Sequence, residues 1–282
     1  MTGSMSVRGF ALRRLVAVLL LFGCALAGRA QSPAATERPG SPSSPIVTVG
    51  VFARHPTELP DQLSAFEREP QVVTVNGSGF FVTAEGHVIT ALHVLRLVES
   101  LRDQITAPVK KIVIGIPGEK GFTAREVAVV ATDEANDLAL LKVTGPVSVR
   151  PVGFASAKPL DATSVEAAGY PSSYGGSSLI TASGLIANFW SMDDGRLVKD
   201  SSQTRQLAVK GAKDLYFAEM RTEPGESGGP VYLTENGAVA GVVRGYIEDP
   251  GLAVFTPARY VIELLKRNHL PYEDVSAPEP AQ

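Results

Sequence analysis

The stretch PGESGGP, residues 224–230, is the part of the sequence that decides the fold. It sets a serine among glycines just before an apolar run. Glycine on both sides of Ser227 lets the backbone turn sharply and aim N–H groups into one concavity, where they can bind a developing oxyanion. A hydroxyl becomes a useful nucleophile only when a neighbouring base takes its proton. The sequence must therefore also supply a histidine and an orienting carboxylate, because otherwise this stretch is an ordinary turn.

His93 is the histidine best placed to act as that base. The stretch 77–94 holds two apolar runs around a Glu-Gly turn, which predicts a hairpin that ends at His93. The other three histidines lie in that turn, before a proline and beyond the last apolar segment, so regular structure does not hold them on both sides. A lone histidine among apolar residues is more often a core residue than a base, so His93 needs a second motif in support.

Asp137 supplies that second motif, at the start of the run DLALLKV, residues 137–143. A carboxylate at the mouth of a strand would be partly buried and held by the strand backbone. That position suits the group that fixes the tautomer of a catalytic histidine and stabilises the imidazolium formed during attack. Taken by itself, an aspartate here is explained equally well as a cap or a solvated strand end.

In their order along the chain, His93, Asp137 and Ser227 resemble the catalytic residues of the chymotrypsin-like (trypsin-fold) serine proteases. The resemblance spans roughly residues 46–268, and its further motifs look like those of the bacterial Deg/HtrA-type branch. The motifs that carry it are TALH at 90–93, DLALL at 137–141, GYP at 169–171, TASGLI at 181–186 and GESGGP at 225–230. The resemblance implies an all-β fold of two antiparallel six-stranded barrels with a C-terminal α-helix.

The same resemblance implies a serine endopeptidase that hydrolyses peptide bonds through an acyl-enzyme intermediate. Ser227 would attack the carbonyl, His93 would take its proton and Asp137 would orient His93. The backbone N–H groups of Gly225 and Ser227 would form the oxyanion hole. This chemistry needs neither a cofactor nor a metal, and we expect none. We also expect none of the PDZ domains that often follow the peptidase in this branch.

Substrate binding is expected along a strand edge, where the family adds the substrate as an extra antiparallel strand. The residues expected to form that edge are Val243, Arg244 and Gly245. Arg221 is expected in the wall of the primary pocket, although exposure or pairing with a neighbouring glutamate is the more ordinary outcome for it. Arg244 and Glu226 depart from the family, which commonly has a small residue at the first position and aspartate or asparagine at the second.

The first thirty residues predict an export signal. Arginines precede an apolar stretch at 15–26 that is too short to span a bilayer comfortably, and small residues follow. Two outcomes stay open: cleavage near Ala27 or Ala30, or lipidation of Cys24 within a sequence that resembles a bacterial lipobox. We therefore expect a periplasmic or secreted protein, with a membrane-anchored lipoprotein as the variant form.

The rest of the chain divides by composition. Residues 31–45 are rich in proline and serine and predict a flexible tether. Short apolar runs separated by turn signals are typical of an all-β barrel or sandwich, with a first barrel at about 46–150 and a second at about 151–255. Apolar residues at helical spacing predict a C-terminal helix at about 257–268, and residues 269–282 are expected to form a flexible tail.

The net charge of the chain limits the classes of partner that it can be expected to bind. Without the four arginines of the first thirty residues, the chain has 22 basic and 29 acidic residues, which argues against a nucleic-acid partner. Polypeptide substrates are expected, and the oligomeric state is not predicted. Two other functions use the same residues. One is a catalytically latent, protease-like peptide-binding module. The other is an esterase, which would ordinarily place its histidine after the serine.

Overall fold

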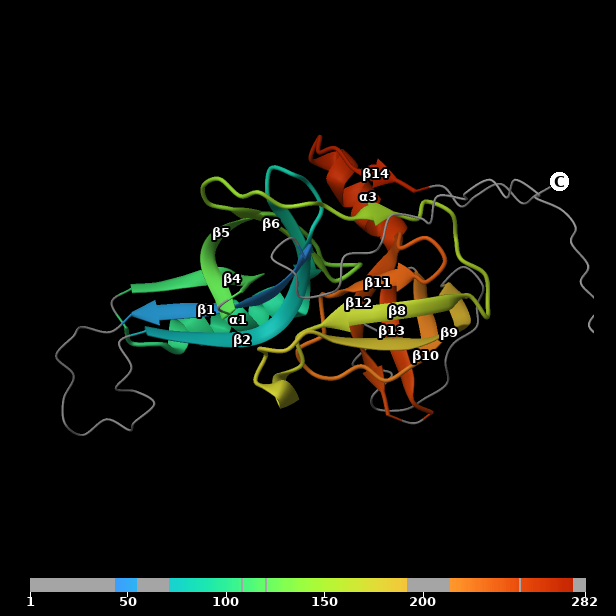
Figure 1. The fold of residues 1–282 in the computed structure, drawn as a ribbon, viewed down its shortest axis with the longest axis horizontal. Coiled ribbons are helices and arrows are strands. Elements are labelled where there is room, and N and C mark those ends of the chain that lie inside the picture. The colour runs from blue at the N-terminus through green and yellow to red at the C-terminus, as the bar shows by residue number, and fades with distance from the viewer. Residues whose placement is uncertain are drawn as a thin grey trace, which may run out of the picture. The chain divides into compact units, whose positions relative to one another are not determined.

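The computed structural model describes most of the chain beyond the expected leader and tether (Figure 1). The predicted signal peptide with Cys24 and nearly all of the predicted tether lie outside the described residues, as do residues 276–282. No helix in the described part is long and apolar enough to cross a membrane. The described residues are 44–54, 71–107, 109–119, 121–191, 214–248 and 250–275.

Six antiparallel strands close into the first barrel, in the order β1-β2-β3-β6-β5-β4. Alternate residues of the first strand, Val47, Val49 and Val51, are buried in the core of this barrel, as expected when successive side chains point to opposite faces. The strands are β1 (Ile46–Arg54), β2 (Gln71–Phe81), β3 (His87–Ala91), β4 (Val109–Gly118), β5 (Gly121–Asp133) and β6 (Leu138–Val143).

The second barrel also has six antiparallel strands, in the order β11-β8-β9-β10-β13-β12, and the pairing of β11 with β12 closes it. In Figure 1 it lies beside the first barrel. Two short strands, β7 (Gly153–Phe154) and β14 (Glu273–Asp274), extend the sheet outward from β12. The barrel strands are β8 (Ser164–Gly169), β9 (Ile180–Ser191), β10 (Asp214–Glu219), β11 (Pro230–Leu233), β12 (Val239–Ile247) and β13 (Leu252–Pro257). The predicted fold class is confirmed.

A helix that the sequence did not predict follows the third strand: α1 (Leu92–Gln104). The hairpin was predicted to end at His93, but β3 ends at Ala91 and His93 lies in the first turn of α1. Leu92, Leu95 and Val98 are buried in the core of the first barrel. Their spacing of three residues brings them onto one face of a helix. That pattern was hidden because it continues directly from the apolar residues of β3.

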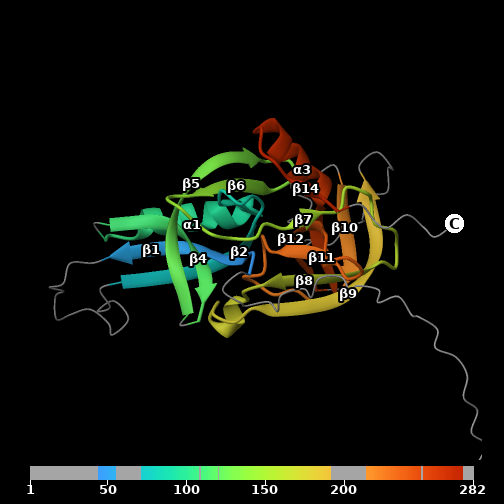
Figure 2. The same cartoon turned by 45° about the horizontal axis from the view of Figure 1, so that its top comes forward.

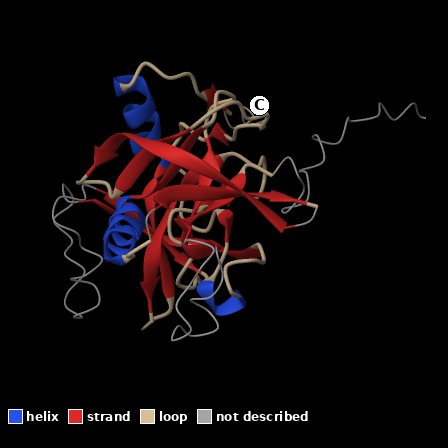
Figure 3. Ribbon diagram, turned by 90° about the vertical axis from the view of Figure 1, so that its left-hand side faces the viewer, coloured by secondary structure: helices blue, strands red, loops and turns tan. Residues whose placement is uncertain are grey.

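The predicted C-terminal helix is present as α3 (Ala258–Arg267), and the short η1 (Ser172–Tyr174) lies in the second half of the chain. Figure 3 shows how few helices accompany the strands. Val261 and Leu265 of α3 are fully buried in a cluster that also contains Ile89 and Leu140 of the first barrel and Val242 of the second. Helix α3 therefore covers apolar residues from both barrels.

Part of the expected flexible tail is fixed by hydrogen bonds. Strand β14 pairs in parallel with β7, and the two lie close together in Figure 2. The N–H of Val275 donates to the carbonyl of Phe154 at 2.8 Å. Leu270 and Tyr272 also pack against the cluster beneath α3. The prediction of a flexible tail from residue 269 is thus corrected as far as residue 275. These apolar residues were too widely spaced to predict an element.

Helix α1 offers a direct test of the core. Leu95→Ala removes a side chain that is 2% exposed and should lower the free energy of unfolding by about 2–5 kcal/mol. Leu97→Ala, two residues further along the helix and 47% exposed, is the matched control and should change it by less than about 0.5 kcal/mol. Urea denaturation followed by circular dichroism measures both values. Equal losses in the two variants would show that α1 does not pack as described.

Candidate active site

His93 and Asp137, which are 44 residues apart in sequence, meet through two hydrogen bonds. Nδ1 of His93 lies 2.7 Å from Oδ2 of Asp137, and the backbone N–H of His93 donates to Oδ1 at 2.9 Å. The Asp137 side chain is 7% exposed, whereas that of His93 is 46% exposed. A buried carboxylate therefore binds the Nδ1 edge of the ring, and Nε2 is left for another partner.

Asp137 also completes the N-terminus of α1. The N-cap residue Ala91 makes no side-chain cap, but the carbonyl of Asp137 accepts the N–H of Leu92 at 3.0 Å and its carboxylate accepts the N–H of His93. The first N–H groups of a helix need such outside acceptors, and a carboxylate there is favoured by the helix dipole. Asp137 has a φ of 56°, a left-handed conformation that aspartate tolerates better than most residues.

The loop around Ser227 leaves two N–H groups free. Glu226, Gly228 and Gly229 donate their backbone N–H groups to carbonyls of Glu223, Val243 and Glu226 respectively. Among the hydrogen bonds of the described residues, none uses the N–H of Gly225 or Ser227. These are the two N–H groups predicted to form the oxyanion hole.

The peptide between Pro224 and Gly225 has a defined orientation. Its carbonyl accepts the N–H of Ser172 at 2.8 Å. In a planar trans peptide the N–H points away from the carbonyl, so the Gly225 N–H faces away from Ser172. Gly225 has a φ of +102°, and a Cβ there would lie 2.6 Å from the N of Ser172 and from the O of Tyr170. Glycine is therefore required for this turn.

Ser78 of the first barrel holds this loop of the second barrel, a role that the sequence did not reveal. Its Oγ donates to the carbonyl of Gly225 at 2.7 Å and accepts the N–H of Tyr170 at 2.8 Å. Its own N–H donates to the carbonyl of Ser227 at 2.9 Å. The available signal was a serine between glycines in an apolar strand, since a buried hydroxyl needs partners.

Close packing brings the Ser227 loop to the end of β3. A Cβ at Gly228 would lie 2.3 Å from the O of Ser78, 2.4 Å from Oγ1 of Thr90 and 2.8 Å from the N of Ala91. The neighbour of Ser227 thus touches the backbone two residues before His93. No hydrogen bond between the side chains of Ser227 and His93 is found among the described residues. Catalytic hydrogen bonds are often long in substrate-free enzymes and shorten when substrate binds.

Glu226, beside Ser227, is a buried carboxyl with no cationic partner among the described residues. Its residue is 2% exposed, Oε2 accepts the N–H of Glu223 at 2.5 Å, and Oε1 has no hydrogen-bond partner. Burial raises the pKa of Glu226, the hydrogen bond from Glu223 opposes the shift, and the charge of Glu223 adds to it. Glu226 therefore anchors the loop at a cost that depends on its ionisation.

The turn that carries Asp137 is braced from several sides. Burial opposes ionisation of Asp133, but hydrogen bonds from Asn136 and Arg267 outweigh it and lower the pKa of Asp133. Thr256 of the second barrel donates its hydroxyl to the carbonyl of Asn136 at 2.9 Å. Strand β13 of the second barrel and helix α3 therefore help to position the aspartate of the first barrel.

The expected substrate-binding residues separate into two groups. Val243 exchanges backbone hydrogen bonds with Gly228 and Gly229, which ties β12 to the Ser227 loop. The side chain of Arg221 is 78% exposed, and its Nε lies 3.9 Å from a carboxylate oxygen of Glu223. Arg221 is therefore exposed and close to a neighbouring glutamate, the more ordinary outcome named in the sequence analysis.

Arg244 differs from the expectation, because its side chain is only 2% exposed and lies beside Asp137 rather than on an open edge. The side chain of Arg244 is therefore not part of an exposed edge, and the carbonyl of Gly245 accepts the hydroxyl of Thr222 at 3.4 Å. Within the described part of the chain, no group of three or more His, Cys, Asp or Glu side chains is placed to hold a metal ion.

A family model for the trypsin-like peptidase domain matches residues 77–242, more than half of the chain and a range that includes His93, Asp137 and Ser227. No curated protein sequence matches the chain.

Solved structures with the same fold include HtrA-type and Deg proteases. AlgW, an HtrA-type protease solved with a decapeptide, is 17% identical with a TM-score of 0.56, over 79% of this chain and 64% of AlgW. The active form of the Rv3671c protease from M. tuberculosis is 23% identical with a TM-score of 0.53, over 83% and 85% of the two chains. Deg5 is 20% identical with a TM-score of 0.52, over 78% and 87%. No PDZ domain occurs among the described residues.

Glu226 gives a pH-dependent stability. Because its pKa is raised on folding, the folded state holds more protons than the unfolded state between the ordinary and the raised pKa, and the free energy of unfolding falls as pH rises through that window. Glu226→Gln should therefore melt at a higher temperature than the unchanged protein above the window, and the difference should shrink towards acid pH.

Thermal denaturation of both proteins from pH 4 to 8 measures this difference. Glu235→Gln, at an exposed turn, is the matched control and should leave the melting temperature unchanged throughout. A lower melting temperature for Glu226→Gln at pH 8 would contradict the account of this residue.

Proposed function

Because the chain belongs to the trypsin-like peptidase family, we propose that it is a serine endopeptidase whose catalytic triad is His93, Asp137 and Ser227. The observation that carries this proposal is the pair of hydrogen bonds from His93 to Asp137, made beside the loop that holds Ser227. A buried carboxylate that binds both the ring and the backbone of one histidine fixes its tautomer and direction. Esterase activity would use the same triad, but the family match favours peptide bonds.

Each group has one task in the proposed reaction. Neutral His93 removes the hydroxyl proton of Ser227 as its Oγ bonds to the peptide carbonyl carbon, and Asp137 stabilises the resulting imidazolium. The negative charge that forms on the carbonyl oxygen is received by the free N–H groups of Gly225 and Ser227. His93 then gives its proton to the leaving amine, and water releases the acyl group from Ser227 by the same steps.

The backbone of β12 suits a polypeptide substrate. Residues 245–247 pair with β13 on one side, and no described strand pairs with them on the other. An extended peptide can add to such an edge through backbone hydrogen bonds. AlgW, which has the same fold, was solved with a decapeptide. We include in this proposal that the enzyme acts in the bacterial periplasm or outside the cell, as a soluble or lipid-anchored protein.

A second candidate function has one observation in its favour. Ser227 and His93 do not share a hydrogen bond in the described structure, as would be expected of a latent, protease-like module that binds peptides without cleaving them. The two free N–H groups and the complete set of triad residues favour the enzyme. Reaction with a covalent probe distinguishes the two candidates, because only an activated serine is modified quickly.

Ser227→Ala tests the nucleophile. It should abolish labelling by a fluorophosphonate and reduce cleavage of a peptide library to background, because the hydroxyl of the proposed nucleophile is removed. Ser177→Ala, in the exposed serine-rich loop, is the matched control and should keep both activities. Gel fluorescence and mass spectrometry measure the two outcomes. Equal labelling of both variants would exclude Ser227, whereas labelling without cleavage of any peptide would favour an esterase or a latent protease.

Asp137→Asn tests the orienting role. Asparagine can still accept the N–H of His93, but it favours the wrong ring tautomer, so kcat should fall by roughly 10⁴-fold with the fold retained. Asp103→Asn, near the exposed C-terminal end of helix α1, is the matched control and should keep kcat within twofold. Steady-state kinetics on a peptide found in the library digest gives both values. A fall of less than tenfold would remove Asp137 from the triad.

A further inference from the structure

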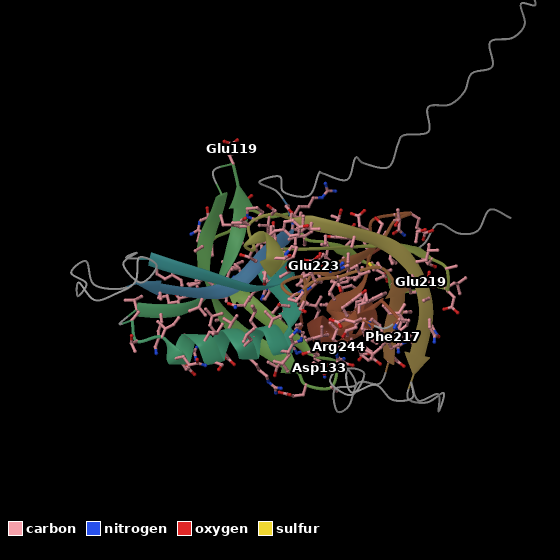
Figure 4. All side chains as sticks on the ribbon, turned by 90° about the horizontal axis from the view of Figure 1, so that it is seen from below. Glu119, Asp133, Phe217, Glu219, Glu223 and Arg244 are labelled. Carbon is pink, nitrogen blue, oxygen red and sulfur yellow. The ribbon has the colours of Figure 1, made fainter. Side chains whose placement is uncertain are left out.

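Arg244 occupies an irregular position in β12. Val243 pairs with Phe255 of β13 and Gly245 pairs with Val254, so Arg244 is an extra residue between two successive pairs. An extra residue of this kind is a β-bulge, which bends the strand and turns the side chain to a new direction. In Figure 4, Arg244 is labelled near the boundary between the two barrels.

The guanidinium of Arg244 is buried with an incomplete set of partners. Its side chain is 2% exposed, and Nε, Nη1 and Nη2 make no hydrogen bond to any residue that the structure describes. Burial lowers the pKa of Arg244, and the nearby charge of Asp137 opposes that shift. Arginine nevertheless stays protonated in proteins, so a full positive charge lies inside the molecule. A buried charge is costly unless an opposite charge compensates it.

The compensating charge is the carboxylate of the proposed triad. Nε of Arg244 lies 3.6 Å from Oδ2 of Asp137, the same oxygen that lies 2.7 Å from Nδ1 of His93. We propose, on the basis of the function proposed above, that Arg244 is a positioning residue: it shares Asp137 with His93, holds the carboxylate in place and keeps His93 neutral to lower pH.

The physical reason is repulsion between like charges across one acceptor. Protonation of His93 would place a second positive charge on the carboxylate that Arg244 already neutralises in part. The imidazolium therefore gains less from Asp137 than it would without Arg244. Neutral His93 is therefore available as a base at lower pH. The imidazolium that forms during attack is stabilised less by Asp137. An enzyme with this arrangement works over a broader acidic range at some loss of maximal rate.

Other charged groups near His93 have partners of their own. Oε2 of Glu226, on the Ser227 loop, accepts the N–H of Glu223. The remaining pairs are at or near the surface: Arg96 with Glu134 and Arg267 with Asp133. Exposed pairs are screened by water, so the buried Arg244 is the cation expected to act most strongly on His93.

Arg244→Met tests the proposal, because methionine keeps an unbranched chain and removes the charge. The acid-side midpoint of the profile of kcat/KM against pH should move up by about one pH unit. Arg244→Lys keeps the charge and should retain the original midpoint. Arg96→Met removes an exposed charge one turn from His93 and should move the midpoint by less than about 0.3 units. A residue that only supports the fold would lower the rate at every pH without moving the midpoint.

The ring protons of His93 give the same information without turnover. Their NMR titration is recorded in the Ser227→Ala background, alone and combined with each arginine variant. A midpoint that rises with Arg244→Met and stays with Arg244→Lys supports the proposal even where no peptide is cleaved, so failure of the proposed protease function is seen separately. An unmoved midpoint in a folded Arg244→Met protein overturns it, as does an equal shift in Arg96→Met.

A third measurement keeps Arg244 unchanged, so it does not depend on whether an arginine variant folds. In ¹⁵N spectra of the Ser227→Ala protein, the Nε–H signal of Arg244 should move through the same midpoint as the ring of His93, because both groups contact Oδ2 of Asp137. An Arg244 signal that stays fixed while His93 titrates contradicts the shared carboxylate.

Discussion

The carboxylate of Asp137 is the constraint on which the rest of the site depends. This buried carboxylate accepts the N–H of His93, binds the His93 ring and lies against the guanidinium of Arg244. The backbone carbonyl of Asp137 accepts the N–H of Leu92. Helix α1 therefore begins where its first N–H groups find this acceptor, and His93 is fixed by the same contact. The same residue thus caps helix α1 and orients the proposed base.

This arrangement requires both barrels to be in place. Asp137 and His93 belong to the first barrel, but Arg244 comes from β12 and Thr256 from β13 of the second. In return, Ser78 of the first barrel holds the carbonyls of Gly225 and Ser227 in the second. Each barrel therefore positions the other's proposed catalytic group. Such mutual dependence favours a site that forms only when the whole domain has folded.

The sequence predicted the parts of this site that follow from local chemistry. Glycines around Ser227 predicted a turn with free N–H groups, and alternating apolar runs predicted the strands. Helix α1 was missed because its buried leucines continue the apolar pattern of β3 without a capping residue in sequence. Its cap, Asp137, lies 44 residues away, and no local pattern can show an acceptor supplied by tertiary structure.

The bracing contacts were missed for the same reason. In the sequence, Ser78 is only a small residue in a predicted strand. Its partners Gly225 and Tyr170 are far away in sequence and are brought to it by the tertiary structure. Arg244 was expected on an open edge because the family resemblance places the substrate along that strand. The bulge in β12 turned it inward, and register shifts of one residue are not visible in a sequence.

Arg244 and Glu226, the two positions that the sequence analysis singled out as unusual for the resembled family, both bury an ionisable side chain. A small residue at the first position and a shorter acid at the second would avoid most of this desolvation. Local rules are ordinarily broken where a function requires it, so the two departures belong together with the site rather than with the core. Arg244 acts on the carboxylate behind the proposed base, and Glu226 acts on the loop that carries the proposed nucleophile. We therefore expect the pH response of the site to depend on these two side chains, which lie behind its proposed catalytic groups, as well as on the catalytic groups themselves.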